Sequence, residues 1–202
     1  PTVTLTDDHS DLRVKDADNV VITATFNESM TSAPTISINV ADGTDADISA
    51  TAMSGSGTTW TYTFDVPSGH DGNATVTVAG TDVAGNAYAG SDTIVYIIDN
   101  TAPNVTLTDD HSDLKVKDAD NVVITATFDE SMTSAPTISI DVAVGTDADI
   151  SATAMSGSGT TWTYTFDVPS GHDGNATVTV AGTDVAGNAY AGSDTIVYII
   201  DN

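Results

Sequence analysis

The chain has 202 residues and a formal net charge of −25, because 29 Asp and Glu face only four Lys and Arg. Nucleic acid and anionic membrane surfaces would be repelled by this charge, so we expect neither as a partner. The absence of Cys excludes disulfides, thiolate metal sites and cysteine nucleophiles, which leaves bound metal as the remaining staple for a secreted protein. No apolar run reaches the roughly 18 residues of a membrane span, so we expect no insertion into a membrane.

Self-comparison shows that the chain is a tandem repeat. Residues 1–100 align with residues 103–202 without a gap, and five positions differ: Thr2/Asn104, Arg13/Lys115, Asn27/Asp129, Asn39/Asp141 and Asp42/Val144. The repeating unit has the size of a whole domain and is too long for a solenoid repeat. We therefore expect a domain at 1–99, a linker at 100–102 and a second domain at 103–202.

The chain ends as the first repeat ends. Asp201-Asn202 stands where Asp99-Asn100 leads into Thr101-Ala102-Pro103 in the first repeat. We interpret the chain as a pair of repeats from a longer protein whose targeting segments lie elsewhere.

Alternation of apolar and polar residues predicts seven strands in each repeat. In the first repeat they are expected, in chain order, at 3–5, 20–26, 36–40, 48–53, 59–66, 74–79 and 93–98. The clearest is the fifth, in which Trp60, Tyr62 and Phe64 alternate with threonines. No segment has helical periodicity. The sequence therefore predicts an all-β fold of two tandem immunoglobulin-like β-sandwich domains, each of seven strands in two sheets, without the Cys-Trp-Cys pattern of antibody domains.

Acidic residues gather in the loops at one end of each predicted sandwich. The chain enters such a sandwich at one end, the incoming end, and leaves it at the other, the outgoing end, where the loops after the first, third and fifth strands meet. Carboxylates 4–6 Å apart oppose one another's ionisation, and Ca²⁺ takes 6–8 oxygen ligands. We therefore expect calcium at the outgoing ends, with ligands among Asp7, Asp8, Asp16, Asp18, Asp45, Asp47, Asp109, Asp110, Asp118, Asp120, Asp147, Asp149 and Asp201.

A second group of oxygen ligands is expected where the linker meets the second domain. Glu130 follows the second strand and Asp184 follows the sixth, which places both at the incoming end. The linker would add Asp99, Asn100 and the carbonyl of Thr101. We predict an interdomain calcium site from these five residues, which would stiffen a linker too short to be a flexible tether. The first repeat has Glu28 and Asp82 at the same positions.

Other interpretations of the sequence are kept beside this one. The acids could be solvated loop residues or an adaptation to salt, but the outer strand faces carry Thr instead of acids. His9-Ser10-Asp11 and His70-Asp71 lie in turns without a nucleophile elbow, so we expect no enzyme. Trp60 and Trp162 could stack on sugars, but each shares a face with core residues, so we expect both to be buried.

Three stretches resemble the bacterial Ig-like extender repeats of large surface adhesins of the RTX and biofilm-associated type. They are Phe26-Asn27-Glu28-Ser29-Met30, Thr81-Asp82-Val83-Ala84-Gly85-Asn86 and Asp99-Asn100-Thr101-Ala102-Pro103. The resemblance implies an extracellular, calcium-stiffened stalk on the bacterial cell surface that holds a distant binding module. It implies metal-binding positions at Glu28, Asp82, Glu130 and Asp184, with Asp99 as the ligand from the linker.

Together these observations predict a structural extender whose partners are calcium ions and neighbouring repeats of the same chain. We expect the protein to be monomeric. The alternative is a calcium-dependent carbohydrate-binding module, or an accessory domain of a secreted polysaccharide-acting enzyme. Such a module would need an exposed aromatic platform beside an ion.

Overall fold

The computed structural model describes residues 1–143 and 148–202. It separates into two compact units, Pro1–Thr101 and Ala102–Asn202, so the division falls inside the linker expected at 100–102. We call them domain 1 and domain 2. Asp147, one of the expected calcium ligands, lies outside the described residues. Within the described part of the chain, no helix has the length and apolar character needed to cross a membrane.

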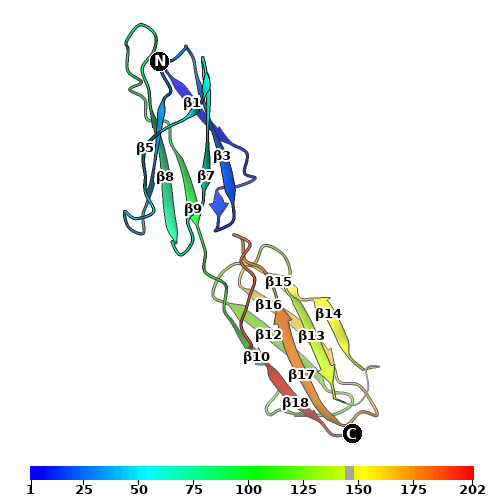
Figure 1. The fold of residues 1–202 in the computed structure, drawn as a ribbon. Coiled ribbons are helices and arrows are strands. Elements are labelled where there is room, and N and C mark those ends of the chain that lie inside the picture. The colour runs from blue at the N-terminus through cyan, green and yellow to red at the C-terminus, as the bar shows by residue number, and fades with distance from the viewer. Residues whose placement is uncertain (144–147) are drawn as a thin grey trace. The chain divides into compact units, whose positions relative to one another are not determined.

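Domain 1 is a sandwich of two sheets (Figure 1). The first sheet has the order β1-β3-β7-β6, and its strands are β1 (Val3–Asp7), β3 (Asn19–Phe26), β7 (Thr59–Asp65) and β6 (Ser54–Ser56). The second has the order β2-β9-β8-β4-β5, and its strands are β2 (Arg13–Val14), β9 (Ile94–Ile98), β8 (Gly72–Ala79), β4 (Thr35–Val40) and β5 (Ile48–Ala52). Only β2 and β9 pair in parallel; the other neighbours in this domain are antiparallel.

Domain 2 repeats this topology. Its first sheet contains β10 (Val105–Asp109), β12 (Asn121–Phe128), β16 (Thr161–Asp167) and β15 (Ser156–Ser158). Its second contains β11 (Lys115–Val116), β18 (Ile196–Ile200), β17 (Gly174–Ala181), β13 (Thr137–Val142) and β14 (Ile150–Ala154). The prediction of two immunoglobulin-like sandwiches of two sheets each is confirmed.

The prediction of seven strands per domain misses two short strands. β2 has two residues and β6 has the sequence Ser-Gly-Ser, which is exposed on both faces, so neither carries an alternating apolar pattern. The strand expected at 48–53 ends at Ala52, and the chain then changes sheets at Met53. The buried Met53 donates its amide to the carbonyl of Pro34 at this crossing.

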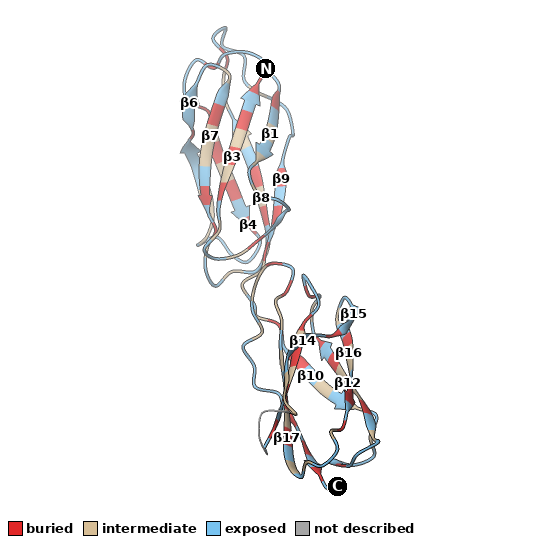
Figure 2. Cartoon of the chain, turned by 90° about the vertical axis from the view of Figure 1, so that its right-hand side faces the viewer, coloured by how far each residue is buried: buried red, intermediate tan, exposed pale blue. Residues whose placement is uncertain are grey.

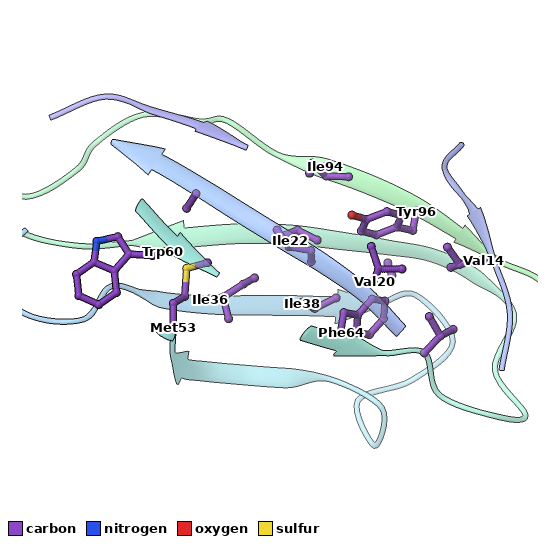
Figure 3. Packing of buried hydrophobic residues seen from close by; sticks show 14 of the residues in the cluster. Val14, Val20, Ile22, Ile36, Ile38, Met53, Trp60, Phe64, Ile94 and Tyr96 are labelled. Atoms are coloured by element: carbon purple, nitrogen blue, oxygen red, sulfur yellow. The ribbon is translucent and has the colours of Figure 1, made fainter. Parts of the chain in front are cut away.

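The core lies between the two sheets of each domain, and buried residues alternate with exposed ones along the strands (Figure 2). In β3 the residues Val20, Ile22, Ala24 and Phe26 point inward, as expected from the pattern. Figure 3 shows Met53 beside Trp60 toward one end of this cluster and Phe64 and Val20 toward the other. Trp60 is only 7% exposed, and its indole N–H donates to the carbonyl of Gly57 at 3.2 Å, so the prediction that it belongs to the core is confirmed.

Candidate metal centre

The side chains of Glu130 and Asp184 meet at the incoming end of domain 2. Glu130 lies two residues beyond the end of β12, and Asp184 forms an isolated antiparallel bridge with Met132. The two residues offer carboxylate oxygens within 4.8 Å of one another. This is the juxtaposition that the strand order predicts, because the loops after the second and sixth expected strands belong to the same end.

Asp184 is held by a tight loop that uses its own carboxylate as a cap. Its Oδ1 accepts the amide of Asn188 at 2.8 Å, while its backbone amide donates to the Asn188 carbonyl at 3.0 Å. Gly187 closes the loop with a φ of 93°, a left-handed conformation that favours glycine. The sequence Thr183-Asp184-Val185-Ala186-Gly187-Asn188 thus fixes the direction of the Asp184 side chain.

The second oxygen of this carboxylate is buried and has no hydrogen-bond partner. Asp184 has an exposed fraction of 0%, and its Oδ2 accepts no hydrogen bond. An uncompensated buried carboxylate costs several kcal/mol in real proteins, so such groups are normally paired or bound to a metal. Beside the half-buried Glu130, this oxygen is suited to bind a cation.

In domain 1 the residue that corresponds to Asp184 is Asp82, and both of its carboxylate oxygens accept hydrogen bonds. Asp82, 2% exposed, accepts the backbone amide of Asn86 on Oδ1 and the side-chain amide of Asn86 on Oδ2, each at 2.8 Å. These hydrogen bonds hold the pKa of Asp82 below its ordinary value, and the bond from the Asn86 side chain has the largest effect. The Glu28 carboxylate lies 3.1 Å from the N-terminal ammonium of Pro1.

All three expected linker ligands make hydrogen bonds inside domain 1. The Asn100 side chain donates to the carbonyls of Pro67 and His70 and accepts the amide of Asp16. Thr101 donates its hydroxyl to Asp71 Oδ2 at 2.8 Å and its amide to Asp99 Oδ1 at 3.2 Å. The Asn100 amide is therefore engaged with its own domain, which the linker sequence alone did not indicate.

The acids at the outgoing ends act as local caps for backbone amides. In domain 1, Asp7 accepts from His9, Asp8 from Val21, Asp16 from Ala17, Asp18 from Lys15 and Asp47 from Val40. In domain 2, Asp109 accepts from His111, Asp110 from Val123, Asp120 from Lys117 and Asp149 from Val142. Over the described ranges, no three of these acids bring ligand oxygens within 4.8 Å of one another. Calcium at the outgoing ends stays a prediction.

Histidine side chains lie among these acids. His111 Nδ1 lies 2.8 Å from the carbonyl oxygen of Asp113, and its Nε2 is 3.8 Å from Asp120 Oδ2. The hydrogen bond to the Asp113 carbonyl, assisted by the charges of Asp120 and Asp113, raises the pKa of His111. Burial and the nearby Asp109 carboxylate likewise raise the pKa of the Tyr198 phenol.

The profile of the family described as Bacterial Ig-like domain (group 3) matches residues 58–202. The chain belongs to this family. The resemblance of the repeats to bacterial Ig-like domains is thereby confirmed. No curated protein matches the chain.

The solved structures that are similar to this chain include two sets of tandem modules. The fibronectin(III)-like modules of Clostridium thermocellum CbhA are 15% identical, with a TM-score of 0.40 over 98% of this chain and 93% of that one. A tetra-tandem repeat from the extending region of a large adhesion protein is 21% identical, with a TM-score of 0.43 over 99% of this chain. The chain spans 49% of the length of that second structure.

Proposed function

We propose that the chain is a structural extender from a bacterial cell-surface adhesin of the RTX or biofilm-associated type, and that Ca²⁺ stabilises it. The proposal has support from the membership of the Ig-like family, from two nearly identical self-contained domains and from a linker of three residues. A unit that is copied almost without change suits a role that gains from repetition, such as reach. The net charge of −25 suits an extracellular setting in which divalent cations are abundant.

The observation that carries the calcium part is the buried, unpartnered Oδ2 of Asp184 beside Glu130. A divalent cation between these carboxylates would compensate the buried charge on Asp184 Oδ2. The ligands are hard oxygens without Cys or His, which favours Ca²⁺ over Zn²⁺ or Cu²⁺. The proposed role is non-catalytic: the ion joins elements of the fold.

Asp99 is proposed as the third carboxylate because the covalent chain keeps it near. Asn104 and Asp129 hydrogen-bond through their backbones and side chains, and Asp129 is the neighbour of Glu130. Only four residues lie between Asp99 and Asn104, so five Cα–Cα steps of 3.8 Å limit the span to about 19 Å. The backbone carbonyl oxygens of Asn100 and Thr101 are further possible metal ligands on the same segment. The side chain of Asn100 is left out of the proposed ligand set, because its amide is already hydrogen-bonded within domain 1.

An ion held by residues from both sides of a short linker would make each joint stiff, so that the lengths of many repeats add up. The test of this stiffening is small-angle scattering of the tandem with calcium and with EGTA. We expect the maximum dimension to fall and the curve to show a broader distribution of shapes after EGTA. An unchanged scattering curve would argue against the stiffening role.

Calcium binding itself is tested by titration calorimetry and thermal melting. Saturation at 100 times the dissociation constant would add about 2.7 kcal/mol to the stability of the domain that holds the ion. We expect Asp184→Asn and Glu130→Gln to weaken binding at least tenfold. Asp82→Asn in domain 1 is the matched control and should leave the interdomain affinity unchanged. Equal melting curves with and without EGTA would refute calcium stabilisation.

The carbohydrate-binding alternative needs an exposed aromatic platform, and neither tryptophan provides one. Trp60 and Trp162 are each 7% exposed, so neither offers a stacking platform. Binding of the tandem to a glycan array in the presence of calcium would reinstate that function, and we expect no binding.

A further inference from the structure

We infer that Asn100 is a positioning residue: it latches the start of the linker onto the outgoing end of domain 1, so that Asp99 and Thr101 belong to the domain before any ion binds. The first support is the number of hydrogen bonds that converge on this one residue. Its Nδ2 donates to the carbonyls of Pro67 at 3.0 Å and His70 at 2.6 Å, and its Oδ1 accepts the Asp16 amide at 2.6 Å. Its own backbone amide donates to Asp71 Oδ1 at 2.5 Å.

These bonds tie together segments that are far apart in the chain. Asp16 belongs to the loop before β3, whereas Pro67, His70 and Asp71 belong to the loop between β7 and β8. Both oxygen and nitrogen of the amide are used, a pattern that only Asn or Gln can offer, and Gln has a longer side chain. The flanking residues are held as well, since the Asp99 amide donates to Val14 and the Thr101 hydroxyl to Asp71.

The second support is that domain 2 contains the same arrangement. Asn202 Nδ2 donates to the carbonyls of Pro169 at 3.0 Å and His172 at 2.6 Å, and its amide donates to Asp173 at 2.8 Å. Its Oδ1 accepts the amide of Asp118 at 2.5 Å. The same asparagine-centred arrangement therefore occurs in both domains.

The third support is local strain in the turn that serves the latch. Ala17 and Ala119 are the residues other than glycine that have a positive φ within the described chain, at 83° and 77°. Each follows directly the aspartate whose amide the asparagine accepts. Alanine is disfavoured in this left-handed region, so the surrounding contacts must hold the turn in place. The Asp18 amide to the Lys15 carbonyl and the latch bond supply such contacts.

The consequence is a division of labour at the joint. Hydrogen bonds within domain 1 set the direction in which residues 99–101 leave the domain, and the ion of the proposed function would act on a segment that is already in place. Affinity for calcium then depends on Asn100 although its side chain touches no ion. This last statement rests on the proposed function, whereas the latch itself does not.

The latch is tested in EGTA by hydrogen exchange of the whole chain, monitored by NMR. We expect Asn100→Ala to speed the exchange of the Asp16 and Thr101 amides at least tenfold and to leave Asp118 unchanged. Asn202→Ala is the matched control and should speed Asp118 alone. Asn100→Asp keeps the shape but places a carboxylate against two carbonyls, so it should act at least as strongly as Asn100→Ala. Unprotected Asp16 and Thr101 amides in the unsubstituted chain would overturn the latch.

The positioning role is tested by calcium titration of the same variants. We expect Asn100→Ala to weaken calcium binding at least threefold and Asn202→Ala to leave it unchanged, although each lowers the stability of its own domain to a similar extent. If Asn100→Ala unfolds domain 1, Asp71→Asn, which keeps an acceptor for the Asn100 amide, replaces it and should speed exchange by a smaller factor. Equal calcium affinities in both alanine variants would overturn the positioning role. Absence of calcium binding by the unsubstituted chain would overturn the proposed function and leave the exchange result to decide on the latch.

Discussion

The repeats differ at five positions, and the residues at two of these positions contact each other in each domain. In domain 1 the Thr2 amide donates to Asn27 Oδ1 at 2.7 Å. In domain 2 the corresponding Asn104 amide donates to Asp129 Oδ1, and the Asn104 side chain adds a bond to Asp129 Oδ2 at 2.9 Å. The repeats have thus exchanged one compatible pair for another beside the proposed metal ligand Glu130.

A double-mutant cycle should reveal this pairing. We expect Asn104→Thr and Asp129→Asn each to lower the stability of domain 2. The sum of the two single losses should exceed the loss in the double variant by a coupling energy of about 0.5 kcal/mol, the size expected for an exposed hydrogen bond. The Asn104 side chain, followed by its backbone amide, lowers the pKa of Asp129. The charge-dependent part is therefore present above the ordinary aspartate pKa of about 3.9 and is lost as the pH falls through the lower folded value.

The pairing can be read by NMR titration of the Asp129 carboxyl carbon. Its midpoint should lie below about 3.9 in the unsubstituted chain and rise toward that value in Asn104→Thr. Additive stabilities together with an unmoved midpoint would show that the two positions diverged independently.

A second prediction at this scale concerns the strained alanine of the Lys15–Asp18 turn. The left-handed conformation of Ala17, with a φ of 83°, costs about 1–2 kcal/mol, and a glycine there avoids this cost but loses more backbone entropy on folding. We expect Ala17→Gly to stabilise domain 1 by up to about 1 kcal/mol, or a few °C in melting temperature. Ala50→Gly in strand β5 is the control and should destabilise it. A loss of stability in Ala17→Gly would show that the strain at Ala17 is smaller than the backbone entropy that glycine loses on folding.

At the scale of elements, the short strand β6 depends on one glycine. Gly55 faces Trp60 across the β6–β7 pair, and a Cβ at this position would lie 2.3 Å from the Thr59 carbonyl oxygen and 2.9 Å from Trp60 Cα. Both atoms belong to backbone and cannot move cheaply. The glycine therefore lets β6 pair closely with β7 at Trp60.

Gly55→Ala should lower the stability of domain 1 by more than about 2 kcal/mol, because its φ of 153° is unfavourable for alanine and the clash displaces β6. Gly57→Ala is the matched control: its φ is 64°, but no atom lies within 4 Å, so its cost should stay near 1 kcal/mol. Urea denaturation and tryptophan fluorescence would measure both. Equal effects would place the cost in the backbone angle alone.

The sequence predicted those elements whose apolar residues alternate. β3, with four buried residues on one face, and β7, with its buried Trp60 and Phe64, lie where the pattern placed them. β2 and β6 were not predictable, because two residues cannot alternate and Ser-Gly-Ser has no apolar member. The parallel pairing of β2 with β9 could not be predicted from the apolar pattern either, since it joins residues more than eighty positions apart.

The candidate site divides in the same way. The order of the strands was enough to place Glu130 and Asp184 at one end of domain 2. The use of the Asn100 side chain was not predictable, because its partners Pro67 and His70 lie in a loop whose position depends on the packing of the whole sandwich. Nor does the sequence distinguish Asp82 from Asp184, which lie in identical hexapeptides but differ in the partner of Oδ2.

At the scale of the whole molecule, each domain has a core of its own: among the described residues, 19 buried apolar side chains form the cluster of domain 1 and 19 form that of domain 2. We therefore expect the fragment 103–202 to fold cooperatively in EGTA, with a melting temperature within a few degrees of the tandem.

The calcium affinity of this fragment should be at least tenfold weaker than that of the tandem, since the fragment lacks Asp99. A fragment of residues 99–202 restores the carboxylate without domain 1, and hence without the contacts of Asn100 to Pro67 and His70. Its affinity should lie between the other two, because the ligand is present but not held in place. Calorimetric titration of the three proteins measures this order, and equal affinity in all three would confine any calcium site to domain 2 and remove the ion from the joint.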